Sequence, residues 1–255
     1  MNSNPGFATV VVSLICVLVL SVSIVTSEAI YSFSATSPRI SGPEQAISKG
    51  PKGVVIAGNA TLTSLIKKAN ALYIAGEYKD AISYYDKALV IQPNNASLLV
   101  NKGNALSQIG NFTGAIKTYD QALVIRPNSS NNFSIFVNRG NALFQSGKLD
   151  EAVKSYDRAL AIKPNLKNAI TNKANVLFEL GNYTGAIIYY DKALSMTSEN
   201  SMILINSKAH ALFELGNYTG AIIYYDKVLS IAPGSASAQE GKYRAVLALN
   251  NSTKK

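Results

Sequence analysis

Apolar residues recur at helical spacing along most of the chain. From about residue 61 to residue 249 they fall at positions i, i+3, i+4 and i+7, which is the spacing of one face of an α-helix. Glycine and proline interrupt this pattern at regular intervals. In one stretch they predict a helix over about 97–109, a turn at 110–111 and a second helix over about 113–126, ended by Pro127. The pattern therefore predicts an all-α fold built from pairs of helices.

The predicted helix pair is an internal repeat. The segment FELGNYTGAIIYYDKAL at Phe178–Leu194 returns at Phe213–Leu229 with a single change, Ala193 to Val228. Weaker copies end at Leu89, Leu123 and Leu160. The alanines near the start of each second helix lie 34, 37, 34 and 35 residues apart, at Ala81, Ala115, Ala152, Ala186 and Ala221. A period of this length indicates a solenoid of stacked helix pairs.

Three columns of residues give the repeat its resemblance to a known family. A small residue marks each first helix, at Ala69, Gly103, Gly140, Ala174 and Ala209. A tyrosine follows four residues after each second-helix alanine, at Tyr85, Tyr119, Tyr156, Tyr190 and Tyr225. Prolines close four units, at Pro93, Pro127, Pro164 and Pro233, and the fourth unit has none. Over about residues 61–249 the chain therefore resembles the tetratricopeptide repeat (TPR) family.

The resemblance implies a TPR-type α-solenoid of about five helix-turn-helix repeats. We expect the repeats at about 61–95, 96–132, 133–166, 167–201 and 202–234, together spanning 61–234. After the fifth repeat the sequence predicts one more helix, over 235–249, with no second helix to pair with it. We therefore expect this helix to cap the C-terminal end of the stack, followed by a polar tail over 250–255. Residues 26–60 mix serine, proline and glycine without periodicity, which predicts a flexible linker.

The N-terminal end carries a hydrophobic segment. After a short tail at 1–6, residues 7–25 contain no charge and are rich in valine, leucine and isoleucine. A helix of this length spans about 28 Å, enough to cross the hydrocarbon core of a bilayer. Small residues at Ser27 and Ala29 also fit a signal-peptidase site. The sequence thus predicts a membrane association and leaves a retained transmembrane helix and a cleaved signal peptide both open.

Asparagine sequons bear on which side of the membrane the repeats occupy. The pattern N-x-S/T occurs at Asn59, Asn95, Asn111, Asn128, Asn132, Asn182, Asn217, Asn250 and Asn251. All fall in predicted linkers, turns or the tail, where an attached glycan would point into solvent. We therefore expect an extracytoplasmic or secreted domain with candidate N-glycosylation at these positions. The alternative is that asparagine followed by threonine or serine is the chemistry of a turn and a helix start.

The concave surface formed by the first helices is the candidate binding site that the family resemblance implies. One inward column reads Asn70, Asn104, Asn141, Asn175 and His210, and a second reads Asn101, Asn138 and Asn172. Aromatic residues form a third column, at Tyr73, Phe144, Phe178 and Phe213, in which repeat 2 has Ser107 instead. The next residue along is polar in repeats 2 to 5, at Gln108, Gln145, Glu179 and Glu214. An asparagine amide both donates and accepts, so a ladder of amides can bind an extended backbone. The same residues could instead only hold the stack together.

Two charged columns are expected to face solvent. Cations precede the small residues at Lys68, Lys102, Arg139, Lys173 and Lys208, and acids follow the tyrosines at Asp86, Asp120, Asp157, Asp191 and Asp226. We expect the cations to extend from the helix edge into water and the acids to form weak surface ion pairs with their sequence neighbours. The net charge of +9 is spread along the chain, and nucleic acid is not an expected partner.

No catalytic chemistry is indicated by the sequence. The chain has one cysteine and one histidine, so no multi-histidine or cysteine-based metal site is expected, and no cofactor or small-molecule substrate is predicted. We therefore expect a non-catalytic scaffold that binds a peptide or protein segment at the outer side of the membrane or after secretion. Two alternatives remain, a membrane-anchored adaptor that faces the cytoplasm and a regulatory subunit of a separate enzyme.

Overall fold

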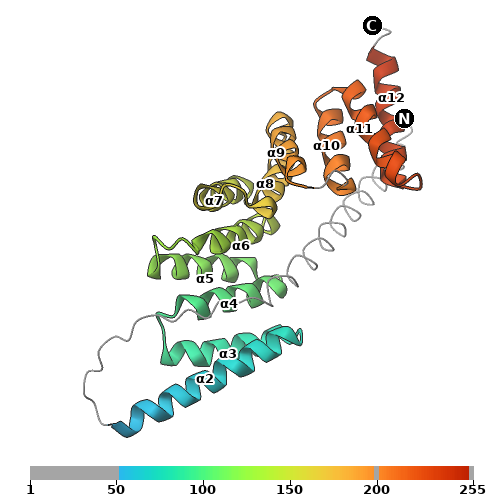
Figure 1. Ribbon diagram of the computed structural model, residues 1–255. Coiled ribbons are helices and arrows are strands. Elements are labelled where there is room, and N and C mark those ends of the chain that lie inside the picture. Colours follow the sequence, from blue (N-terminus) through green and yellow to red (C-terminus); the bar gives the residue numbers. More distant parts are fainter. Residues whose placement is uncertain (1–51, 198–200, 253–255) are drawn as a thin grey trace, which may run out of the picture. The chain divides into compact units, whose positions relative to one another are not determined.

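The computed structural model describes residues 52–197 and 201–252, and within these ranges every regular element is a helix (Figure 1). The helices are α2 (Lys52–Ile74), α3 (Tyr78–Ile91), α4 (Ala96–Gln108), α5 (Phe112–Ile125), α6 (Asn132–Gln145), α7 (Leu149–Ile162), α8 (Lys167–Glu179), α9 (Tyr183–Ser195), α10 (Met202–Glu214), α11 (Tyr218–Ile231) and α12 (Ala236–Ser252). The hydrophobic segment at 7–25 lies outside the described residues. Among the described helices, none is long and apolar enough to cross a membrane.

The helices form five pairs followed by α12. We call the even-numbered helices α2 to α10 helices A and the odd-numbered helices α3 to α11 helices B. Helices that follow one another in the chain pack together, and α6 also contacts both α4 and α8 (Figure 1). In the same way α12 contacts α10 as well as α11. Helices A of neighbouring repeats therefore lie side by side in the middle of the stack, and α12 takes the place of a helix A at its end.

Each turn between helix A and helix B depends on a glycine in the left-handed region. These residues, Gly76, Gly110, Gly147, Gly181 and Gly216, have φ between 75° and 84°. In the first turn, the backbone N–H of Glu77 donates to the carbonyl of Leu72 over 2.9 Å and the N–H of Gly76 to the carbonyl of Tyr73 over 3.1 Å. These bonds satisfy the last carbonyls of helix A, so glycine both ends the helix and reverses the chain.

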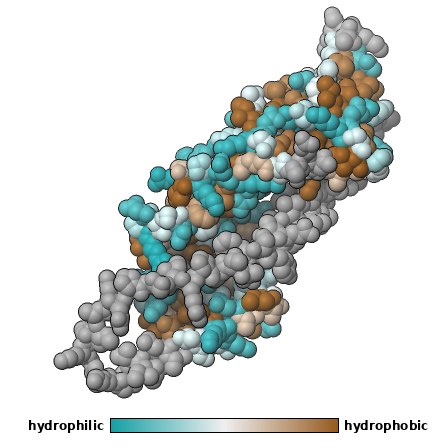
Figure 2. Space-filling model, in the orientation of Figure 1, coloured by the Kyte–Doolittle hydropathy of each residue, from teal (hydrophilic) through white to brown (hydrophobic). Residues whose placement is uncertain are grey.

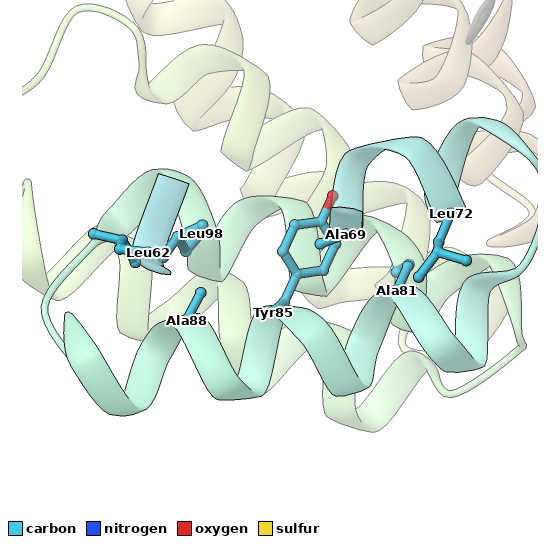
Figure 3. Packing of buried hydrophobic residues seen from close by; sticks show 8 residues of the cluster. Leu62, Ala69, Leu72, Ala81, Tyr85, Ala88 and Leu98 are labelled. Atoms are coloured by element: carbon cyan, nitrogen blue, oxygen red, sulfur yellow. The ribbon is translucent and has the colours of Figure 1, made fainter. Parts of the chain in front are cut away.

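Each repeat has the same core. In the first repeat, the Tyr85 ring projects from α3 toward α2 beside Ala69, with Ala81 and Ala88 one turn away on either side (Figure 3). A Cβ atom on Gly103 would lie 2.6 Å from the Tyr119 ring, and one on Gly140 would lie 2.7 Å from the Tyr156 ring. The small-residue column is therefore the space that the tyrosine ring occupies.

Two predicted boundaries differ from the structure. The first helix begins at Lys52 and not at 61, so the last part of the predicted linker, including Asn59, is helical. No proline lies between 52 and 74, so beyond the first turn every residue of this stretch has a backbone N–H that can bond within the helix. At the other end α12 continues to Ser252, and Asn250 and Asn251 lie in its last turn and not in a tail. No glycine or proline follows Gly241 to end that helix earlier.

Apolar and polar surface alternate along the face that Figure 2 shows. Single large apolar side chains are exposed on several helices B, with Val90 at 81% and Val124 at 80% exposure. Scattered exposed apolar residues are usual for folded proteins and do not by themselves mark a binding site.

Candidate partner-binding surface

The first asparagine column is bonded to the buried tyrosines of the same repeats. In repeats 1 to 4 the tyrosine hydroxyl donates to Oδ1 of the asparagine fifteen residues before it, over 2.7–2.8 Å, in the pairs Tyr85–Asn70, Tyr119–Asn104, Tyr156–Asn141 and Tyr190–Asn175. In repeat 5 the Tyr225 hydroxyl lies 3.0 Å from Nδ1 of His210. A buried phenol needs a polar partner, so this column helps to pair helix A with helix B.

Burial raises the pKa of these tyrosines. It raises the pKa of Tyr85 to about 12, and it raises the pKa of the other four core tyrosines as well. A tyrosine hydroxyl is protonated at neutral pH in any case, and burial keeps it a hydrogen-bond donor further into the alkaline range.

The second asparagine column links neighbouring repeats. Nδ2 of Asn138 donates to Oδ1 of Asn104 over 3.0 Å, and Nδ2 of Asn172 donates to Oδ1 of Asn141 over 2.8 Å. Each accepting oxygen thus receives one bond from its own repeat and one from the next. Asn101 lies in the same register, but the described part of the chain shows no such bond for it. The structure brings the two predicted columns together, and both contribute to the stack.

The tyrosine bonds also orient the amide groups of the first column. Because Oδ1 accepts from the tyrosine, Nδ2 is directed away from it. Within the described residues, no protein acceptor bonds to Nδ2 of Asn70, Asn104, Asn141 or Asn175, and none of these nitrogen atoms is a buried unpaired group. Each of these four asparagines is half-buried. Repeats 1 to 4 therefore each present one oriented amide donor that solvent can reach.

The aromatic column lies at the turn end of the helices A. Its four members are half-buried, and three of them make contacts with a helix B tyrosine at centroid distances of 5.4–5.5 Å, in the pairs Tyr73–Tyr78, Phe178–Tyr183 and Phe213–Tyr218. Ser107 interrupts the column, and its hydroxyl oxygen is buried without a partner. These rings are partly core residues, and each keeps an exposed part.

The charged columns form a ladder of ion pairs that was not expected from the sequence. Each aspartate on helix B pairs with the cation of the next repeat, over 2.5–2.7 Å, in the pairs Asp86–Lys102, Asp120–Arg139, Asp157–Lys173, Asp191–Lys208 and Asp226–Lys242. The expectation of solvent-exposed cations is wrong for Lys173 and Lys208, which are only 8% and 7% exposed. Lys68 is exposed, because no described helix B precedes α2.

The two buried lysines have additional partners. Nζ of Lys173 donates to the Tyr189 hydroxyl, and Nζ of Lys208 to the Tyr224 hydroxyl, each over 2.7 Å. Burial alone would lower the pKa of each lysine, but the hydrogen bonds to aspartate and tyrosine outweigh it and the pKa is raised. The signal in the sequence was the presence of opposite charge at fixed positions on either side of every repeat boundary.

Four sequon asparagines are helix N-caps. Oδ1 accepts from the backbone N–H three residues later over 2.9–3.1 Å at Asn95, Asn111, Asn182 and Asn217. In three of these caps the third residue is glycine, where a Cβ would lie within 2.9 Å of the asparagine Oδ1. Helix capping therefore accounts for the motif N-x-T-G without glycosylation.

The sequons also differ in accessibility. Asn111, Asn128, Asn182, Asn217, Asn250 and Asn251 are exposed, and Asn95 is half-buried. Asn132 is 2% exposed, and its Nδ2 donates to the backbone carbonyls of Arg126 and Pro127. The expectation that every sequon points into solvent is therefore wrong for Asn132, because its amide nitrogen closes the loop before α6.

Comparisons with known proteins agree with this architecture. Models of the tetratricopeptide repeat match residues 66–132, 134–166 and 171–236. A solved structure of MamA aligns with a TM-score of 0.62 at 23% identity, over 73% of this chain and 96% of that chain. YrrB, described as a TPR protein with an unusual peptide-binding site, aligns with a TM-score of 0.64 at 20% identity, over 74% and 96%.

A tetratricopeptide repeat protein from Parabacteroides merdae aligns with a TM-score of 0.66 at 22% identity, over 76% of each chain. No curated protein sequence matches this chain. Since these three structures are each under 25% identical to this chain, they support the fold and not a particular partner. Among the described residues there is also no group of three or more histidine, cysteine or acidic side chains that could hold a metal ion.

Proposed function

Since the chain belongs to the tetratricopeptide repeat family, whose members are generally non-catalytic interaction scaffolds, we propose that it binds an extended peptide or protein segment along the concave face of its helices A. The fold of YrrB, described as having a peptide-binding site, supports this proposal. The partner would lie against the two asparagine columns and the aromatic column.

The row of oriented amide donors carries the proposal. Nδ2 of Asn70, Asn104, Asn141 and Asn175 is held outward by the tyrosine bond to Oδ1, and an outward N–H can donate to a backbone carbonyl of the partner. Since the tyrosine fixes each amide before binding, little side-chain entropy is lost when the partner arrives.

The spacing of the donors suits an extended chain. Neighbouring packed helices lie about 8–10 Å apart, and an extended chain rises about 3.3 Å per residue. Each repeat would therefore contact about three partner residues. The exposed parts of Tyr73, Phe144, Phe178 and Phe213 add apolar contact beside this row.

Asparagine-to-aspartate substitutions test the proposal without removing the tyrosine's acceptor. In Asn141→Asp with Asn175→Asp, the side chain keeps an oxygen for Tyr156 and Tyr190 but loses the outward N–H donors. We expect the full chain to keep its thermal unfolding midpoint within a few degrees and to lose capture of uncharged twelve-residue peptides on an array. Asn94→Asp with Asn128→Asp, in exposed loops, is the charge-matched control. Unchanged capture by the first pair would contradict groove binding.

We further propose that residues 7–25 attach or export the domain and that the repeats act outside the cytoplasmic membrane. The support is the uncharged length of 7–25 and the three exposed sequons that are not helix N-caps, at Asn128, Asn250 and Asn251. External protease added to intact cells should digest the repeats, while a cytoplasmic marker protein stays intact. Protection of the repeats until the membrane is opened would reject this location.

A further inference from the structure

Repeats 4 and 5 place the same two residues at the end of helix A. Phe178 and Glu179 end α8, and Phe213 and Glu214 end α10. Both phenylalanines are half-buried and both glutamates are exposed. Repeats 2 and 3 have glutamine at this position, Gln108 and Gln145. Among repeats 2 to 5, only repeats 4 and 5 therefore carry a negative charge there.

The two carboxylates lie on the proposed binding face. Glu179 is four residues after Asn175, and Glu214 is four residues after His210, so each lies one helical turn along the same face. Burial is the main cause of the raised pKa of Tyr190, and the charge of Glu179 adds to it. The Glu179 charge thus acts on the same hydroxyl group that bonds Asn175.

In repeat 5 the chain supplies its own cation to this pair. The guanidinium of Arg244, from α12, lies 4.9 Å from the centroid of the Phe213 ring. The charges of Arg244 and Glu214 act in opposite directions on the pKa of Tyr225, which burial raises. The guanidinium thus lies over the ring of the phenylalanine that directly precedes Glu214 in the sequence, and an aromatic face beside an acidic residue is a favourable combination for a cation.

Repeat 4 has the same phenylalanine and glutamate without the cation. Arg244 stands two residues after Lys242, and its counterpart at the repeat 4 boundary is His210, two residues after Lys208. His210 is shorter, and its ring nitrogens face Tyr225 and Ser237. Within the described residues, no lysine or arginine lies over the Phe178 ring or pairs with Glu179.

We propose that repeat 4 binds an arginine side chain of the partner segment, with the guanidinium over Phe178 and beside Glu179. The inference rests on the proposed groove function and adds a chemical preference to it. The guanidinium of Arg244 on Phe213 is the internal example of the contact. The partner is then an extended segment with at least one arginine, and lysine binds the same place more weakly because its ammonium group does not stack on a ring.

Matched peptides test this preference on the full chain in non-ionic detergent. The probes are fluorescein-labelled nine-residue peptides of glycine and serine whose central residue is arginine, citrulline or glutamate. Citrulline has the shape of arginine without its charge. By fluorescence anisotropy we expect about tenfold tighter binding of the arginine peptide than of the citrulline peptide. Glu179→Gln should reduce this ratio to about twofold or less.

Glu214→Gln is the control, since Arg244 already occupies that position, and the ratio should stay within about twofold of wild type. Arg244→Ala opens the second position, and a peptide with two arginines three residues apart should gain about threefold to tenfold in affinity.

Equal binding of the arginine and citrulline peptides would overturn the inference, and so would an unchanged ratio in Glu179→Gln. If both peptides still bind, and Asn141→Asp with Asn175→Asp removes that binding, groove binding stands. Binding of none of the peptides would overturn the arginine preference itself.

Discussion

Two boundaries in the stack have the same kinds of contact in different surroundings. The inner boundary lies between repeats 3 and 4, and the terminal boundary lies between repeat 5 and α12. At the inner boundary, Tyr156 bonds Asn141 and Asp157 pairs with Lys173. At the terminal boundary, Tyr225 bonds His210 and Asp226 pairs with Lys242. Both tyrosines are fully buried, but the Lys173 side chain is 10% exposed and the Lys242 side chain 38% exposed.

The difference in lysine exposure shows that the helix B that follows a lysine shields it from solvent. Lys173 is covered by its own helix B, where its Nζ bonds Tyr189 and lies 4.2 Å from the ring centroid. No described helix B follows α12, so Lys242 has no equivalent cover. The lysine of the ion pair is therefore nearly buried inside the stack and partly solvated at its end, while the aspartate is about half exposed at both boundaries. Loss of the aspartate should have unequal consequences at the two places.

Removing the acid should have the largest effect at the inner boundary. Asp157→Asn leaves the charge of the buried Lys173 without its counter-ion, and we expect a loss of about 2 kcal/mol in the free energy of unfolding. Asp226→Asn leaves Lys242 in contact with water and should cost about 0–1 kcal/mol. Urea unfolding followed by circular dichroism measures both. Equal losses would show that the two ion pairs do not differ in burial as the structure indicates.

Removing the phenol hydroxyl should have a smaller effect. Tyr156→Phe deletes the donor to Asn141, whose oxygen keeps its bond from Asn172, so we expect a loss of about 1 kcal/mol. Tyr225→Phe leaves Nδ1 of His210 without its hydroxyl partner at the edge of the stack and should cost about the same or less. Hydrogen exchange resolves the effects by helix, and α12 should lose protection only in Tyr225→Phe. Loss of protection in α12 for Tyr156→Phe would mean that the repeats do not respond separately.

The features that the sequence predicted well depend on neighbours in the sequence or on the repeat period. The glycine turns, the recurring columns of small residues and tyrosines, and the helix pairs all follow from local backbone preference and from the repeat period. The turn at Gly110 follows from the amino-acid sequence alone, because a glycine lies at this place in all five repeats. The packing of the Tyr119 ring against Gly103 is given only by the structure.

The features that the sequence missed depend on contacts between repeats. Asp157 was interpreted beside its sequence neighbour Arg158, yet its partner is Lys173, sixteen residues later. Asn132 looked like an ordinary turn residue, and its burial follows from the insertion that lengthens the loop before α6. The asparagine columns were predicted as one face, but only the structure shows that their oxygens bond tyrosine and leave the amide nitrogens outward.

The terminal boundary alone should respond to mild acid, because His210 replaces asparagine there. Its pKa is lowered by burial and by the charge of Arg244, and Tyr225 and Glu214 are the other titratable groups near it. A lowered pKa means that the neutral ring favours folding. This contribution is complete above the ordinary histidine pKa of about 6.5 and is lost as the pH falls through the folded value.

Protonated His210 cannot accept from Tyr225 and repels Arg244, so α12 should exchange its amide hydrogens faster as the pH is lowered from 7 to 5, after correction for the intrinsic exchange rate. The inner helices should not change over this range beyond the general effect of pH. His210→Asn restores the residue of the other four repeats and should abolish the effect in α12 while keeping an acceptor for Tyr225. The same acid response in His210→Asn would assign the effect to Glu214 and contradict the role of the histidine. If amide exchange in α12 of the wild type does not change between pH 7 and pH 5, the terminal and inner boundaries differ only in solvent exposure.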